Sequence, residues 1–162
     1  MLAAGMLWLG AGCAGGRLVE GMYRDSAHRY QIRIPTAPWL PVSLDGATVA
    51  FRAPDLQAAM AFSVDCKAPE PGGLPWIARH LFFGLQAKRI QSREAIHLRD
   101  TEGVRTRLVA RLDEVPVEVE GVTVQRGDCL YDFMYVAPPA TFPRGQADFQ
   151  DFVESWSPLP GE

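Results

Sequence analysis

The sequence lacks most of the motifs by which enzyme and metal sites are recognised. Its three histidines, His28, His80 and His97, do not show the spacing of zinc ligands such as H-x-x-x-H, and there is no C-x-x-C. It has no G-x-S-x-G turn for a serine nucleophile and no glycine-rich phosphate loop. We therefore predict no catalytic residues, no metal site and no cofactor.

One short segment, residues 25–28, does bring an acid, a hydroxyl and an imidazole together in Asp25, Ser26 and His28. A hydrolase would also need donors that stabilise an oxyanion, and no loop of that kind accompanies the segment. We interpret it as a polar turn before the first strand.

Excess positive charge is also absent. The chain has 16 Lys and Arg against 19 Asp and Glu, a net charge of −3, and no basic run. A nucleic-acid binder needs a positive face to displace counterions from phosphates, so we expect no nucleic-acid partner.

The nearest approach to a basic cluster is the alternation of Arg105, Arg107 and Arg111. Their side chains would share one face of a strand. They could contact an anionic headgroup or an acidic partner, or they could pair with Glu118 and Glu120 on the following strand.

Long apolar runs are scarce. Residues 1–12 are apolar and uncharged, but a bilayer-spanning helix needs about 20 residues. The segment fits the apolar core and cleavage region of a secretory signal. Because Gly-Ala-Gly directly precedes Cys13, it resembles a lipobox, in which signal peptidase cleaves before the cysteine and the thiol is acylated. A plain secreted protein, or a buried amino-terminal helix with an incidental cysteine, are the alternatives.

The rest of the chain has enough apolar residues for one core, since 48% of the sequence is hydrophobic. We expect a signal peptide over residues 1–12, a tether over 13–21, a single domain over 22–158 and a tail over 159–162. No internal repeat marks a second domain.

Alternation of apolar and polar residues, together with turn signals between the segments, predicts a series of strands, of which residues 88–98 show the least regular pattern. The expected strands cover residues 30–34, 48–53, 57–67, 88–98, 104–112, 117–124 and 129–136. The apolar phase shifts by one residue across Gly121, which is typical of a β-bulge.

Helical spacing occurs in two places. Leu74, Ile77, Leu81 and Leu85 lie on one face of an expected helix over residues 74–85. A final helix would carry the apolar residues Phe149, Phe152, Val153 and Trp156. Trp76 and Phe83 lie off the main stripe of the first helix, so they would form an exposed contact site or belong to a wider buried face.

This order of elements predicts an α+β fold, in which an antiparallel sheet of about six or seven strands is covered by helices. Residues 30–35, followed by Trp39 and then residues 45–51, resemble the opening of the PsbP/DcrB-like sandwich domain. Residues 131–135 resemble its last strand. The residues that resemble its last helix are Phe142, Phe149, Phe152, Val153 and Trp156.

More narrowly, the chain is similar to a group of uncharacterised lipoproteins from delta-proteobacteria and their relatives. In that group a cysteine ends an early strand, as Cys66 does, and a Gly-x-Cys-x-Tyr-Asp stretch opens the last strand, as residues 127–132 do. The resemblance covers roughly residues 22–156. It implies a shared scaffold and carries over no catalytic residue.

If Cys13 is acylated, Cys66 and Cys129 remain as an even number of cysteines in an oxidising compartment. We expect both on strands with apolar neighbours. A structural disulfide between them is our prediction, with two free core thiols as the alternative. A redox role is not favoured, because core burial raises the pKa of a thiol.

The sequence therefore suggests a non-enzymatic lipoprotein held at the cell envelope by Cys13, acting as a binding or accessory module for an envelope protein. Ala14 after the cysteine resembles the outer-membrane sorting pattern. The alternative is a carrier or accessory factor for a lipid or another small apolar ligand that serves an envelope transporter.

Overall fold

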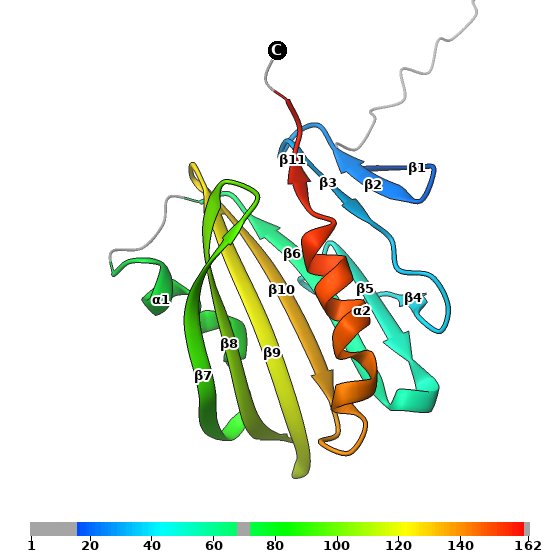
Figure 1. The fold of residues 1–162 in the computed structure, drawn as a ribbon, viewed down its shortest axis with the longest axis vertical. Coiled ribbons are helices and arrows are strands. Elements are labelled where there is room, and N and C mark those ends of the chain that lie inside the picture. Colours follow the sequence, from blue (N-terminus) through cyan, green and yellow to red (C-terminus); the bar gives the residue numbers. More distant parts are fainter. Residues whose placement is uncertain (1–15, 68–71, 161–162) are drawn as a thin grey trace, which may run out of the picture.

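The computed structural model describes residues 16–67 and 72–160, which form two antiparallel sheets (Figure 1). The large sheet has seven strands in the order β4-β5-β6-β10-β9-β8-β7. In that order its strands are β4 (Leu40–Val42), β5 (Val49–Ala53), β6 (Ala58–Asp65), β10 (Cys129–Ala137), β9 (Val115–Arg126), β8 (Thr101–Leu112) and β7 (Gln86–Leu98).

A small four-stranded sheet lies beside it, at the upper right of Figure 1. Its strands, in spatial order, are β1 (Arg17–Val19), β2 (Met22–Asp25), β3 (Tyr30–Arg33) and β11 (Ser157–Pro158). The α+β fold with a seven-stranded antiparallel sheet agrees with the sequence prediction.

The main core lies between the small sheet, the long helix α2 (Phe142–Glu154) and one face of the large sheet. Aromatic rings fill it: Tyr30 of β3 contacts Phe62 of β6 at a centroid distance of 5.1 Å, and Phe133 of β10 lies 5.7 Å from Phe152 of α2. Each buried aromatic ring removes a large apolar area from water, so these rings contribute strongly to the stability of the core.

The opposite face of the large sheet carries a second, smaller core. It is covered by the short helix α1 (Leu74–Ile77) and the 3₁₀ turn η2 (His80–Phe82). Phe82 packs there with the apolar side chains Leu108, Ala110, Val117 and Val119 of β8 and β9.

The predicted helix over 74–85 was wrong as a continuous element. The chain is helical only in α1 and η2, Phe83 is extended, and Gly84 has a φ of +88°. The interrupted backbone instead lets Phe82 and Leu81 pack against the sheet. Tertiary packing overrides a helical pattern that is short and weakly supported by local interactions.

The predicted bulge at Gly121 was also wrong. Gly121 pairs in regular register with Thr106 of β8 and with Met134 of β10. The apolar phase shifts because β9 is buried on both faces, with Val119 in the second core and Val122 in the main core. Irregular register occurs instead in β7, between Gln86 and Arg89 and between Ile90 and Ser92.

Two boundaries differ from expectation. Residues 17–19, which we assigned to the tether, form β1 and pair with β2. Helix α2 ends at Glu154, so Trp156 lies just beyond it, although its side chain is fully buried in the main core as expected.

Candidate functional site

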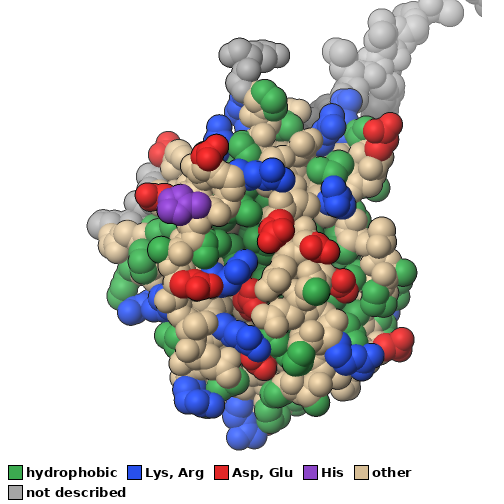
Figure 2. All heavy atoms as spheres, viewed as in Figure 1, with side chains coloured by type: hydrophobic (Ala, Val, Ile, Leu, Met, Phe, Trp, Pro, Cys, Tyr) green, Lys and Arg blue, Asp and Glu red, His purple; other side chains and the backbone are tan. Residues whose placement is uncertain are grey.

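The alternating arginines of β8 are paired with carboxylates. The guanidinium of Arg107 contacts Glu118 Oε1 at 2.6 Å, and Nε of Arg105 lies 3.4 Å from Glu120 Oε1. Figure 2 shows basic and acidic side chains intermixed on this face. The pairing with β9 is the second of the two interpretations offered by the sequence.

Arg111 differs from the other two arginines. Its guanidinium donates to the backbone carbonyl of Glu114 and lies 3.6 Å from that residue's carboxylate, within the β8–β9 turn. The arginines therefore do not form one free anionic contact site.

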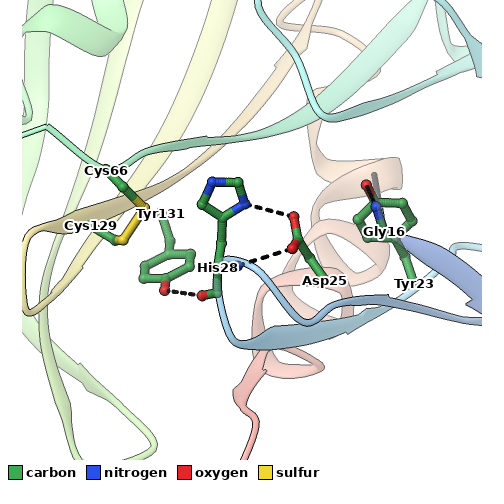
Figure 3. A network of polar contacts seen from close by, with 7 residues as sticks. All are labelled: Gly16, Tyr23, Asp25, His28, Cys66, Cys129 and Tyr131. Carbon is green, nitrogen blue, oxygen red and sulfur yellow. Dashed lines mark hydrogen bonds and ion pairs between the residues drawn. A yellow bond between two sulfur atoms is a disulfide. The ribbon is translucent and has the colours of Figure 1, made fainter. Parts of the chain in front are cut away.

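The predicted disulfide is present between Cys66 and Cys129 (Figure 3). The β6–β10 ladder ends at the pair Asp65 and Leu130, so the two cysteines occupy the next opposed positions. The expectation that both lie in the core was wrong, because Cys66 follows β6 and is exposed, and Cys129 is half-buried.

Asp25 is the last residue of β2, and residues 26–28 lie in the turn that leads into β3. A turn before β3 was expected, but β2 before it was not. The Asp25 carboxylate accepts a hydrogen bond from the His28 backbone N–H at 3.0 Å and contacts His28 Nδ1 at 2.8 Å (Figure 3). Burial alone would raise the pKa of Asp25, but the hydrogen bonds to His28 outweigh it and lower the pKa. Tyr131 donates to the His28 carbonyl, which fixes the turn against β10.

A groove of about 410 Å³ lies on the η2 side of the large sheet, between the loop at residues 44–47 and η2. Asp132 of β10 and Ser63 of β6 line it together with apolar residues such as Met134. Burial raises the pKa of Asp132, although Thr123 donates a hydrogen bond to its carboxylate at 2.6 Å.

The same side of the molecule carries large exposed apolar side chains. Phe83 is 90% exposed, Trp76 is 48% exposed and Ile90 is 49% exposed. Phe83 shares an apolar hollow of about 190 Å³ with Leu112 at the end of β8. The sequence left open whether Trp76 and Phe83 are exposed or belong to a wider buried face, and the structure shows that both are exposed.

Cations lie among these apolar side chains. Arg79 stacks over the ring of Trp76 at 5.0 Å, and a second hollow of about 210 Å³ opens beside it. We call this the basic hollow. It is lined by Arg79, Phe82, Lys88, Ile90, Arg93 and Leu108.

We call the whole region the distal surface. It comprises Trp76, Phe83 and Leu112 together with the residues of the basic hollow. It combines exposed aromatic rings and arginines, two kinds of side chain that are enriched at protein–protein interfaces, with aliphatic side chains.

The fold has relatives among solved structures. The solution structure of cyanobacterial PsbP (CyanoP) from Synechocystis sp. PCC 6803 matches 98% of this chain and 99% of its own, with a TM-score of 0.65 and 13% identity. The fold is PsbP-like. The match confirms the fold expected from the resemblance, and at this identity it shows the fold alone.

Two further structures share the architecture. PA94, a protein of unknown function from Pseudomonas aeruginosa, matches 86% of this chain and 97% of its own, with a TM-score of 0.57 and 16% identity. A protein from Bacteroides thetaiotaomicron VPI-5482 has a TM-score of 0.60 and 7% identity; the match covers 91% of this chain and 50% of that one. No family model and no curated protein sequence matches the chain.

Sequence reasoning located part of this surface and missed part. It singled out Trp76 and Phe83 because they lie off the apolar stripe. It did not bring Lys88, Ile90 and Arg93 to the same place, because β7 is irregular and its faces cannot be assigned from alternation. The cysteine expected to be acylated, Cys13, lies outside the described residues.

Within residues 16–67 and 72–160, no helix has the length and apolar character needed to cross a bilayer. In the same ranges no group of three His, Cys, Asp or Glu side chains is placed to hold a metal ion.

Proposed function

We propose that this PsbP-like protein is a non-enzymatic lipoprotein of the cell envelope that binds a partner protein through its distal surface. The observation that carries the proposal is Phe83, whose side chain is 90% exposed and lines an apolar hollow with Leu112. Exposing a large aromatic ring forgoes the free energy of burying it, roughly 1.5–3 kcal/mol. A binding surface recovers that free energy when the partner covers the ring.

The position of the surface fits a tethered module. Strand β1 begins at Arg17, so residues 14–16 alone separate it from Cys13. A chain of that length reaches roughly 10–14 Å when extended. Acylation of Cys13 would therefore hold the small sheet close to the membrane. Figure 1 places the small sheet and α1 on opposite sides of the molecule, so α1 and the distal surface would face away from the anchor.

The anchor is tested by Cys13→Ser in the native organism. We expect the wild type to fractionate with membranes, on the outer membrane in the proposed sorting, and its intact mass to include acyl chains. The variant should appear in the soluble fraction without added mass. Equal membrane association of both proteins, with an unmodified wild-type mass, would refute the lipoprotein proposal.

The partner surface is tested by placing a photo-reactive residue at position 83 of the membrane-anchored protein. Leu40 of β4 is the matched control, since it is also exposed and lies at the other edge of the large sheet. We expect one adduct of defined mass at position 83 that is absent at position 40. Monomer alone at both positions would count against a protein partner.

A second candidate function is a carrier for a small ligand, favoured by the groove of about 410 Å³ beside Asp132. Its volume lies within the roughly 300–1,000 Å³ of small-molecule pockets. Solvent extraction of the purified protein and mass spectrometry would detect a stoichiometric ligand. An Ala61→Trp variant should fill the groove and abolish retention of any ligand found.

A further inference from the structure

We propose that the basic hollow is a binding site for an acidic peptide segment in which a large apolar side chain lies between carboxylates. The inference rests on the proposed function, since it names the chemistry of the partner that the distal surface would bind. The hollow offers an apolar floor, a cationic rim and a volume suited to a single side chain.

The floor is apolar because it consists of Phe82 of η2, Ile90 of β7 and Leu108 of β8. Its volume, about 210 Å³, is smaller than the roughly 300–1,000 Å³ that enclose a whole small molecule. A cavity of this size fits one anchoring side chain of a longer ligand, the arrangement found at the energetic centres of protein interfaces.

The rim carries Arg79, Lys88 and Arg93. Lys88 donates to the Phe82 carbonyl at 3.3 Å, and Arg93 Nε donates to the Thr106 hydroxyl at 3.3 Å. These two bonds hold both cations at the rim and leave most of their donors available. Among the described residues, none of the three forms an ion pair of the kind that neutralises Arg107.

This contrast between the two sheet faces supports an anionic ligand. Arg105 and Arg107, on the α2 side of the sheet, are matched by Glu120 and Glu118, whereas within residues 16–67 and 72–160 no carboxylate forms an ion pair with a cation of the basic hollow. A row of like charges around an apolar floor repels itself and is stabilised by carboxylates supplied from outside.

The position of the hollow favours a peptide over an anionic membrane. Its floor includes η2 and the first half of β7, on the opposite side of the large sheet from α2. An anchor at Cys13 would hold the small sheet against the bilayer instead. A protein partner can approach the distal surface from the side away from the anchor.

The test uses the whole 162-residue chain with the substitution Cys13→Ser, so that no acyl chain interferes. The protein is kept under oxidising conditions, so that the Cys66–Cys129 disulfide stays formed. The probe is a seven-residue peptide with a central phenylalanine flanked by glutamates. Its binding is measured by NMR from the chemical-shift changes of the protein's backbone amides. We expect saturable shifts at Phe82, Lys88 and Ile90. Replacing the peptide's phenylalanine with alanine, or its glutamates with lysines, should abolish saturation.

The paired variants are Arg79→Glu with Lys88→Glu, against Arg52→Glu with Lys67→Glu. Both change the net charge equally, but Arg52 and Lys67 are exposed residues outside the hollow. We expect the first pair to weaken peptide binding about tenfold and the second to change it less than about twofold. If both pairs of substitutions weakened peptide binding equally, the effect would come from the net charge of the protein and not from the hollow, and the proposal would be overturned.

Two further outcomes would also overturn it. One is that the amide shifts of the wild type do not saturate with peptide, although the wild type and the variants have the same melting temperature and are therefore equally folded. The other is binding of phosphatidylglycerol vesicles, but not of the peptide, with the same sensitivity to Arg79→Glu and Lys88→Glu. Failure of the peptide together with a specific adduct at position 83 would reject the acidic segment and leave the partner surface standing. Failure of both would reject both.

Discussion

At the scale of single residues, two arginines on the same strand are expected to contribute differently to the stability of the fold because their surroundings differ. Arg107 lies against the ring of Phe142 at 4.8 Å and pairs with the buried Glu118. Arg111 lies at the open end of the same strand and contacts the exposed Glu114. Removing the cation from a buried carboxylate is costly, whereas an exposed ion pair contributes little.

We therefore expect Arg107→Ala to lower the free energy of unfolding by about 1–3 kcal/mol. Arg111→Ala, the matched control, should change it by less than about 0.5 kcal/mol. Urea denaturation of both variants at neutral pH measures the difference. Similar losses in the two variants would contradict the inferred environments.

Asp132 offers a second residue-scale prediction. Burial raises its pKa, so the folded state binds a proton more tightly than the unfolded state. Its contribution to stability is therefore fully present below the ordinary pKa of 3.8 and is lost as the pH rises through the raised value. Asp132→Asn keeps an acceptor for Thr123 and removes the charge.

We expect Asp132→Asn to be more stable relative to the wild type at pH 7 than at pH 4. Thermal unfolding of both proteins across that interval is the measurement, and Asp45→Asn in the exposed loop is the control. A constant difference between Asp132→Asn and the wild type would show that Asp132 ionises normally.

At the scale of elements, η2 depends on the absence of a side chain at Gly121. A Cβ at this position would lie 2.6 Å from Cζ of Phe82 and 2.7 Å from Cδ2 of Leu81. The lack of a side chain at Gly121 therefore allows η2 to pack closely against β9, while the pairing of β9 remains regular.

We expect Gly121→Ala to destabilise the protein by about 1–3 kcal/mol, because the added methyl group overpacks the contact. Phe82→Leu in the same chain should relieve part of the clash, so the two substitutions should couple favourably in a double-mutant cycle. Additive losses would contradict a direct contact between Gly121 and Phe82.

At the scale of the whole molecule, the disulfide closes a loop with a sequence separation of 63 residues. That loop contains α1, η2, β7, β8 and β9, and so the entire distal surface. Cross-linking a loop of this length stabilises a fold by roughly 4 kcal/mol in the chain-entropy model, and by less where the unfolded chain keeps structure.

The double variant Cys66→Ala with Cys129→Ala should lose up to about 4 kcal/mol of unfolding free energy relative to the oxidised wild type. Reduced wild type is the control and should lose a similar amount. Titration of the unfolded mature protein should find no reactive thiol from this pair before reduction. Two reactive thiols without reductant would contradict the bond.

The sequence by itself determined the elements that depend on local alternation. A strand with one buried face shows a period of two residues, and β3, β6 and β8 were predicted on that basis. The even pair Cys66 and Cys129 and the aromatic residues of α2 were also correct. These features could be predicted because each depends on the order of apolar, polar and cysteine residues within a short segment.

Only the tertiary structure decided how those segments cover one another. Periodicity reports that a residue is buried but not which element buries it, so the two-sided burial of β9 was mistaken for a bulge at Gly121. The break between α1 and η2 and the exposure of Phe83 have the same origin. Each depends on contacts between residues far apart in the chain, which no local pattern encodes.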